Sequence, residues 1–191
     1  MKKDLLVLGF AVLLAVFLLR GTKIQSVEDY YQTHIDDITE DFQVVTLSIR
    51  CDTVLDHYDR LKKELQDEKY VPKDGVILAP TEYVLRKGDT VFDILRRATR
   101  HEQIQMEYQG ADQNACQSVY IEGIHYLYEF SCGELSGWMY KVNGSFPREG
   151  CSSCTLHNGD VVEFVYTCDL GRDVGGSFGN GNNNSVKEEK Q

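Results

Sequence analysis

The chain has 191 residues, of which 42% are hydrophobic and 10% aromatic, proportions typical of a folded globular protein. Its formal net charge at pH 7 is −10. Affinity for nucleic acid depends largely on Lys and Arg side chains that neutralise phosphates. This charge, together with the lack of a basic stripe, therefore argues against nucleic acid as a partner.

Residues 1–21 are typical of a targeting segment, because Lys2 and Lys3 precede an uninterrupted apolar run from Leu5 to Leu19. The run ends in leucines and Arg20 instead of the small residues of a cleavage site, which favours an uncleaved signal anchor over a cleaved signal peptide. The two lysines predict a cytoplasmic N-terminus. We therefore expect a single-pass cell-membrane protein whose domain lies outside the cytoplasm, or a secreted protein if the segment is cleaved.

Composition divides the remainder into three parts. Residues 22–43 are acidic and weakly patterned, and we expect a stalk there. Residues 44–170 hold the regular apolar patterns of a single folded domain. Residues 171–191 are polar and rich in Gly and Asn, which predicts a disordered tail.

Apolar patterns predict the elements of the domain in chain order. Residues 44–51 and 161–166 show the two-residue alternation of half-buried strands. Apolar residues at helical spacing predict a short amphipathic helix or helical loop within residues 53–68. Residues 76–85 are expected to be extended, and the proline at position 80 suits an edge strand.

A second helix is predicted over residues 91–101, where Asp89 or Thr90 can cap its first turn. Further strands are expected within residues 119–130 and around Trp138, before a type I′ turn. This order resembles a β-grasp layout, an α+β fold in which a mixed sheet packs on one main helix. In that layout the first and last strands are parallel neighbours in the middle of the sheet.

Residues 75–171 resemble the transcobalamin-like C-terminal domain family, as a bacterial-type, surface-anchored single-domain member. The resemblance rests on three runs: VILAPTEYVLRKGDTVFDIL, YIEGIHYLYEFSCGELSGWMYKVNG and GCSSCTLHNGDVVEFVYTCDLG. It implies a secreted or surface-attached β-rich module. In the animal vitamin carriers of this kind a related module closes over cobalamin held against a helical barrel. This chain has no room for such a barrel, so the resemblance leaves cobalamin as a candidate ligand and not as a bound cofactor.

Six cysteines, an even number in a chain with a targeting segment, predict a disulfide framework. Cys51 and Cys168 have the same face parity on strands expected to be parallel neighbours, which predicts a bridge between them. The pairs Cys132–Cys151 and Cys116–Cys154 remain as a guess.

The C-x-x-C spacing of Cys151 and Cys154 also suits a thiol-disulfide enzyme or a metal site. Thioredoxin-type chemistry needs the first cysteine at a helix N-terminus, and zinc needs a second ligand pair. Neither is evident in the sequence, so we expect structural cysteines and no metal.

Two aromatic stripes are candidates for a ligand-stacking platform, although sheet core is the more common role of such stripes. The ligand-binding candidates are Trp138, Tyr140, Asn143 and Tyr128. No catalytic group is evident, so we do not expect an enzyme. The sequence predicts a membrane-anchored, extracytoplasmic module that binds a small molecule, with cobalamin or another corrinoid as a candidate, or a surface protein. The alternative is a structural or adhesive surface module without a small ligand.

Overall fold

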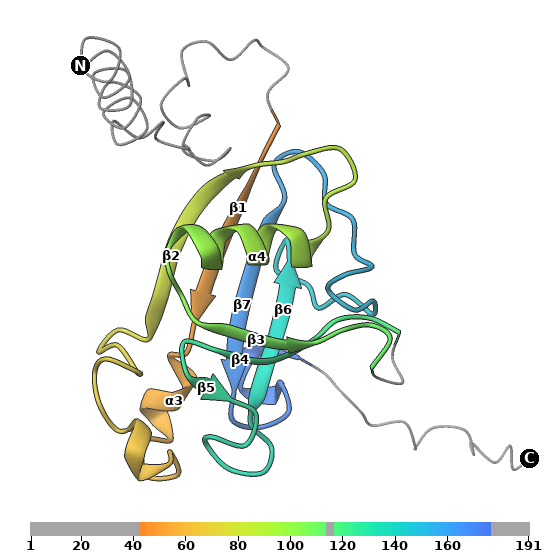
Figure 1. Cartoon of the computed structure of the whole chain (residues 1–191). Helices are drawn as coiled ribbons and strands as arrows, with labels where there is room; N and C mark the ends of the chain where they lie inside the picture. Colours follow the sequence, from red (N-terminus) through yellow and green to blue (C-terminus); the bar gives the residue numbers. More distant parts are fainter. Residues whose placement is uncertain (1–42, 114–116, 177–191) are drawn as a thin grey trace, which may run out of the picture. The chain divides into compact units, whose positions relative to one another are not determined.

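The central sheet of the computed structural model has four strands in the order β2-β1-β7-β6 (Figure 1). Strand β1 (Val44–Arg50) is parallel to β7 (Val161–Thr167), and both lie in the middle of the sheet. Strand β2 (Val76–Val84) is antiparallel to β1, and β6 (Gly137–Val142) is antiparallel to β7. The predicted parallel pairing of the first and last strands is confirmed, as is the edge position of the proline-bearing strand.

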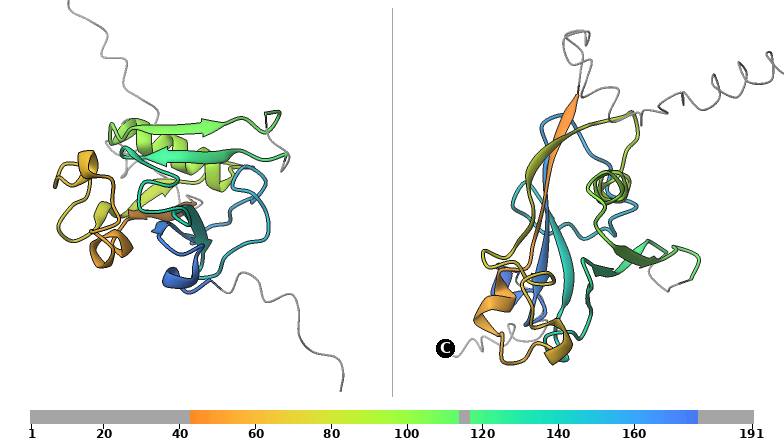
Figure 2. Two further views of the ribbon diagram at one scale, coloured as in Figure 1. Left: turned by 90° about the horizontal axis from the view of Figure 1, so that it is seen from below. Right: turned by 60° about the vertical axis from the view of Figure 1, so that its left-hand side comes forward.

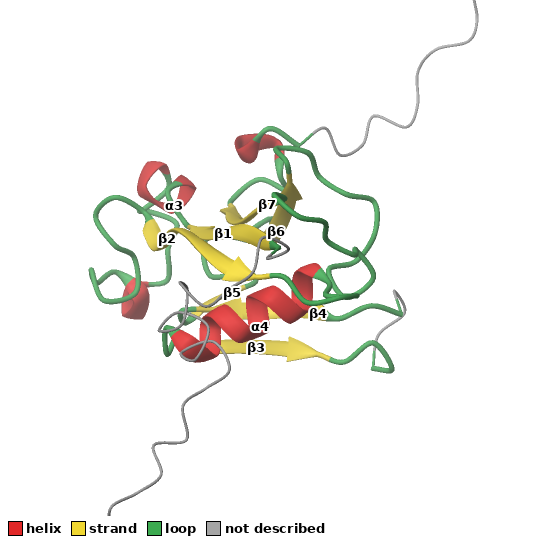
Figure 3. Ribbon diagram, turned by 90° about the horizontal axis from the view of Figure 1, so that it is seen from above, coloured by secondary structure: helices red, strands yellow, loops and turns green. Residues whose placement is uncertain are grey.

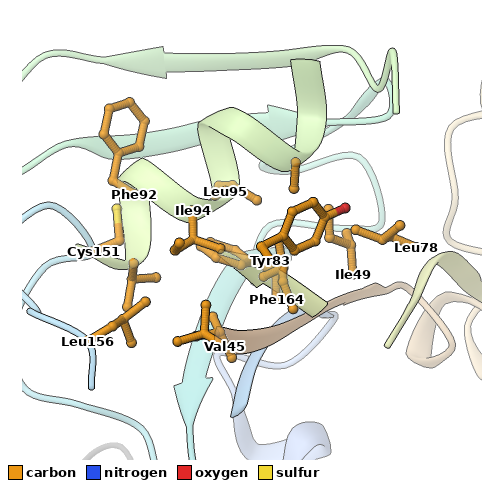
Figure 4. Packing of buried hydrophobic residues seen from close by; sticks show 14 of the residues in the cluster. Val45, Ile49, Leu78, Tyr83, Phe92, Ile94, Leu95, Cys151, Leu156 and Phe164 are labelled. Carbon is orange, nitrogen blue, oxygen red and sulfur yellow. The ribbon is translucent and has the colours of Figure 1, made fainter. Parts of the chain in front are cut away.

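Helix α4 (Val91–His101) covers one face of this sheet. Thr90 caps it, because its side chain accepts from the Asp93 N–H while the Asp93 carboxylate accepts from the Thr90 N–H. This reciprocal capping box satisfies two N–H groups that a helix start leaves without partners. Figure 4 shows Ile94 and Leu95 pointing from the helix towards Phe164 and Val45 of the sheet, where the main core lies.

A second, three-stranded sheet was not predicted. It has the order β3-β4-β5, with β3 at Met106–Gln109, β4 at Tyr120–Ile124 and β5 at Leu127–Tyr128. It lies beside α4, on the same side of the central sheet (Figures 2 and 3). The segment 119–130 was expected as strands of a single sheet. It forms its own sheet because β4 pairs with β3 and β5, and not with any central strand.

The segment between β1 and β2 is less helical than its apolar spacing indicates. It holds only the short helix α3 (Thr53–Asp56) and the 3-10 helix η2 (Lys63–Leu65). Leu55 and Tyr58, two residues of the expected stripe, are each 37% exposed. Leu61 instead packs into a second buried cluster at the end of the sheet, whose members are Cys51, Val54, Leu61, Val71, Leu127, Cys132, Tyr166 and Cys168.

The structure describes residues 43–113 and 117–176, all of which belong to one compact unit. The predicted anchor, nearly all of the predicted stalk and Cys116 lie outside the described residues. The chain continues in defined structure beyond position 170, with the 3-10 helix η3 (Arg172–Val174). The rest of the expected tail, residues 177–191, also lies outside. Within the described ranges, none of the helices has the length and apolar character needed to span a membrane.

Candidate functional site

Strand β4 and the edge strand β6 belong to different sheets but pass close to each other (Figure 1). An apolar groove is lined by residues of both strands. Its first part is a small hollow of about 220 Å³. Aromatic and aliphatic side chains supply most of its lining, which consists of Val119, Tyr120, Ile121, Trp138, Met139, Tyr140, Phe146, Pro147, Gly150, Cys151 and Phe164. Such a lining provides contact area for an apolar ligand.

A larger hollow of about 450 Å³ adjoins the small one, because both are lined by Tyr120, Trp138 and Met139. The loop between β5 and β6 forms one wall and the chain after β7 forms another. The remaining lining residues are Glu129, Phe130, Glu134, Leu135, Ser136, Gly137, Thr167 and Leu170. We call the two hollows together the groove.

Large apolar side chains stand open to solvent along the groove. The exposed fractions are 43% for Tyr120, 55% for Phe130, 42% for Leu135 and 53% for Leu170. These four residues come from three different segments, yet all line the larger hollow. Scattered exposed apolar residues are ordinary, but a cluster of them around a hollow is typical of a binding surface.

Trp138 is held in a fixed position at the junction of the two hollows. Its Nε1–H donates to the Leu127 carbonyl oxygen at 2.7 Å. Its ring meets the buried ring of Tyr166 edge-on, with centroids 5.2 Å apart. Because the polar atom of the indole is already satisfied, the part of the ring that lines the groove offers purely apolar contact.

The rim of the larger hollow is acidic, with Glu129 and Glu134 in its lining. The Tyr120 hydroxyl donates to Glu129 Oε2 at 2.5 Å. Burial, reinforced by this carboxylate, raises the pKa of Tyr120 to about 12, so the tyrosine stays neutral at physiological pH. The carboxylates of Glu129 and Glu134 at the rim can accept hydrogen bonds from a ligand's N–H groups or attract a cation.

One backbone edge of β6 also faces away from the sheet, since β6 is the last strand in the order. Just beyond β6, the Asn143 N–H donates to the Val161 carbonyl oxygen at 2.8 Å. By the alternation of an antiparallel ladder, the N–H and C=O groups of Met139 and Lys141 face β7, and those of Trp138 and Tyr140 face outward. In the described part of the chain, β6 has no second neighbouring strand.

The structure brings together two of the four predicted ligand-binding residues. Trp138 and Tyr140 line the small hollow, and Tyr140 stacks on Phe164 with centroids 5.8 Å apart. The Tyr140 hydroxyl donates to the Glu149 carbonyl oxygen at 2.6 Å, which fixes this wall.

The other two predicted residues lie outside the groove lining. The Asn143 amide donates to Asp160 and accepts from the Val161 N–H, so it supports the turn after β6. The Tyr128 hydroxyl belongs to the second sheet, where it donates to Glu107 Oε1 at 2.6 Å. These contacts give both side chains structural roles.

Sequence reasoning missed most of the groove, because more than half of its lining comes from loops and from the chain beyond β7, and only the remainder comes from β4, β6 and β7. Phe130 has a φ of +61°, a conformation that non-glycine residues seldom adopt. Its ring projects to solvent instead of continuing the expected strand. No sequence pattern indicates the positive φ of Phe130 or the exposure of its ring. Trp138 and Tyr140, by contrast, are recognisable because they alternate along a strand.

The five described cysteines are free thiols in the structure. Cys51 and Cys168 lie in the same buried cluster, but the Cys168 thiol is hydrogen-bonded to Cys132 and to Thr53. Cys151 packs in the main core, apart from Cys132. The contacts therefore do not match the predicted pairs Cys51–Cys168 and Cys132–Cys151.

The C-x-x-C segment forms turns beside the start of α4, and the N–H of Phe92 donates to the Cys151 carbonyl oxygen at 2.9 Å. Burial raises the pKa of the Cys151 thiol to about 12. Among the described residues, no cluster of three or more His, Cys, Asp or Glu side chains is placed to hold a metal ion.

Comparison with known proteins gives one family match and several structural likenesses. Residues 88–167, less than half of the chain, match the model of a domain of unknown function, DUF4430. No curated protein matches the chain in sequence.

Two solved structures illustrate the likenesses. Haptocorrin in complex with Cbi is 14% identical with a TM-score of 0.46, over 70% of this chain and 27% of the haptocorrin chain. A protein from Ruminococcus gnavus ATCC 29149, described as a candidate metal-binding protein, is 8% identical with a TM-score of 0.38. That likeness covers 65% of this chain and 96% of the other.

Proposed function

We propose that this chain is a non-catalytic binding module whose groove holds a small, largely apolar molecule. The observation that carries the proposal is the cluster of exposed apolar side chains around two adjoining hollows. Leaving such side chains in water costs free energy, and a ligand that covers them recovers it.

The size and lining of the groove favour a small ligand with a flat apolar body and a polar edge. The larger hollow, of about 450 Å³, falls within the roughly 300–1,000 Å³ of known ligand sites, and the smaller one, of about 220 Å³, extends it. Trp138 and Tyr140 offer aromatic surface for stacking, and Glu129 and Glu134 offer acceptors at the rim. A corrinoid such as cobalamin combines an extended ring with amide donors around it, and is our first candidate.

We place the module outside the cytoplasm, tethered to the membrane by residues 1–21. This part of the proposal rests on the apolar run after Lys2 and Lys3 and on the even number of cysteines. A reporter fusion that reads out the side of the membrane on which residue 191 lies tests it. A cytoplasmic signal would overturn it.

A second candidate function is a structural or adhesive surface module, and the free edge of β6 favours it. The outward N–H and C=O groups of Trp138 and Tyr140 could pair with an extended segment of another protein. In that case the exposed apolar residues would cover the side chains of the added strand.

Trp138 is the only tryptophan of the chain, so its fluorescence reports directly on the groove. We would titrate the purified full-length chain with cobinamide and with cyanocobalamin, correct for their absorbance, and measure retention by equilibrium dialysis. Saturable quenching with matching retention is the expected result. Absence of retention would remove the corrinoid as ligand.

Two matched variants locate the binding site. Phe130 and Tyr126 are both exposed aromatic residues with positive φ, but only Phe130 lines the groove. Phe130→Ser should weaken binding about tenfold, by the loss of apolar contact worth about 1.4 kcal/mol, and Tyr126→Ser should leave it unchanged. Nile red, an uncharged apolar dye, serves as a second probe. If neither corrinoid nor dye binds, the small-molecule proposal fails and strand pairing at β6 is favoured.

A further inference from the structure

Two buried thiols meet where the loop between β5 and β6 touches the end of β7. Cys132 lies in that loop, and Cys168 follows β7 directly. Their side chains are 0% and 3% exposed, and the two thiols are hydrogen-bonded to each other. Sulfur atoms in hydrogen-bonding contact need only a small movement to reach bonding distance.

Hydrogen bonds on either side of the thiols hold the two segments together. The Leu170 N–H donates to the Leu135 carbonyl oxygen at 2.9 Å. The Ser136 hydroxyl accepts from the Cys132 N–H at 3.0 Å and lies 3.0 Å from the Tyr166 hydroxyl. The relative position of Cys132 and Cys168 is therefore fixed by neighbours in both segments and not by the sulfur atoms alone.

Cys51 is the third cysteine of the same cluster, but the register of the sheet places it poorly for a bridge to Cys168. Arg50 pairs with Val165 on the parallel strand, so the next position, Cys51, comes opposite Tyr166. Two residues along a strand and one strand across separate Cα atoms by about 8 Å, and disulfides rarely span more than about 7 Å.

The electrostatic surroundings make the two thiols unequal. The hydrogen bond from Cys168 lowers the pKa of the Cys132 thiol and outweighs the opposing effect of burial, and the nearby positive charge of Arg60 lowers it further. The same hydrogen bond and burial raise the pKa of Cys168. Cys132 is therefore the thiol that ionises first and attacks an oxidant, and Cys168 is the resolving thiol.

We propose that Cys132 and Cys168 form an intramolecular disulfide that ties the loop between β5 and β6 to the end of β7. The oxidant is a disulfide, such as oxidised glutathione. The Cys132 thiolate attacks one of its sulfur atoms and releases one glutathione thiolate. Cys168 then loses its proton, and its sulfur attacks the Cys132 sulfur and releases the second glutathione. Two protein thiols lose two electrons and two protons, and one glutathione disulfide is reduced to two thiols.

The bridge acts on the groove, because the tied loop supplies part of the larger hollow. The lining residues Glu129, Phe130, Glu134, Leu135 and Ser136 all belong to it. Linking Cys132 to Cys168 fixes this wall against the chain that carries Thr167 and Leu170 on the other side. The pairing does not depend on what the groove binds.

Peptide mapping tests the pairing on the full-length chain. Trypsin leaves Cys151, Cys154 and Cys168 in one peptide, so chymotrypsin is the suitable protease. The protein is equilibrated with a glutathione redox buffer, alkylated with iodoacetamide in denaturant, and digested without reduction. We expect a linked species that joins residues 131–138 to residues 167–178, or residues 131–135 to residues 167–170 where the protease also cleaves after leucine. A link from Cys168 to Cys51, a link from Cys132 to Cys151, or recovery of both thiols alkylated would overturn the proposal.

Stability measurements provide a second test, first on the unmodified protein and then on cysteine variants. The urea midpoint of the oxidised protein should exceed that of the protein reduced in denaturant and refolded with reductant, and equal midpoints would contradict the proposal. Under oxidising conditions Cys132→Ser, Cys168→Ser and the double variant should share one lowered midpoint, because each removes the same bond. Cys154→Ser, a cysteine outside the cluster, is the matched control and should retain the linked peptide.

Discussion

Trp138 and Tyr166 face each other across β6 and β7, as register partners whose rings meet edge-on at a centroid distance of 5.2 Å. Tyr166 is fully buried, whereas Trp138 is half-buried and packs against both buried clusters. The pair thus connects the interior to the groove, and a disturbance of Tyr166 should reach the ring that forms the groove.

The hydroxyl of Tyr166 provides the first prediction. It donates to the Tyr128 carbonyl oxygen at 2.7 Å and lies 3.0 Å from the Ser136 hydroxyl. Tyr166→Phe should lower the free energy of unfolding by about 1–2 kcal/mol, because buried polar groups lose their partner. Urea titration followed by Trp138 fluorescence measures the change. Tyr108→Phe, at a position 41% exposed, is the control and should change stability little.

A pair of glycines tests the packing of the second sheet. A Cβ added at Gly123 would lie 2.6 Å from Cδ1 of the Tyr128 ring, whereas at Gly137 the nearest atom is Glu129 Cβ at 3.9 Å. Gly123→Ala should therefore cost about 1–3 kcal/mol through overpacking. Gly137→Ala should cost much less, and thermal unfolding of the two variants compares them. Equal costs would show that Tyr128 moves aside freely.

The ion pair between Asp89 and Arg97 predicts a dependence of stability on pH. The Arg97 Nη2 atom lies 2.6 Å from Asp89 Oδ2, with side chains only 12% and 11% exposed. Burial opposes the charge of Asp89, but hydrogen bonds from Arg97 and from the Arg86 N–H outweigh it and hold its pKa below the ordinary value of 3.8. The stabilisation is thus complete above pH 3.8 and is lost as the pH falls below it.

Asp89→Asn should lower the free energy of unfolding at pH 7 by about 3 kcal/mol, because it leaves a nearly buried guanidinium without its counter-charge. The difference from the parent should shrink when urea titrations are repeated near pH 3. Asp56→Asn, at an exposed position, is the control. A difference that stays constant with pH would rule out the charge as its cause.

The thiols of the C-x-x-C segment should react slowly. Burial raises the pKa of Cys151 to about 12 and also raises that of Cys154, so little thiolate is present at pH 7.5. Brief labelling of the reduced native protein with iodoacetamide, located by mass spectrometry, should find both cysteines labelled far more slowly than in 8 M urea. Fast labelling of both would revive the thiol-disulfide enzyme as an alternative.

The central sheet could be predicted because its signals are local and agree with one another. The alternation of residues 44–50 and 161–167 gives two strands, and Pro80 identifies an edge. The capping box at Thr90 marks the start of α4. Each of these features depends on neighbours in sequence, which a single chain displays.

The groove and the cysteine contacts depend on register and loop path, which no local pattern encodes. Face parity predicts that Cys51 and Cys168 share a side of the sheet, but parity does not distinguish a directly opposite residue from one two positions away. Likewise, Tyr128 and Trp138 both look like strand aromatics, and only the separation of the two sheets assigns them to different surroundings.

The parallel pairing of β1 with β7 has a consequence for biosynthesis. Strand β1 gains its second neighbour only from β7, so a nascent chain cannot complete the central sheet until residues 161–167 have been synthesised. Until then the apolar face of β1 needs protection from premature association. A ribosome-stalled chain that ends before Val161 should therefore be digested readily by protease, and one that extends well past Gly176 should resist it.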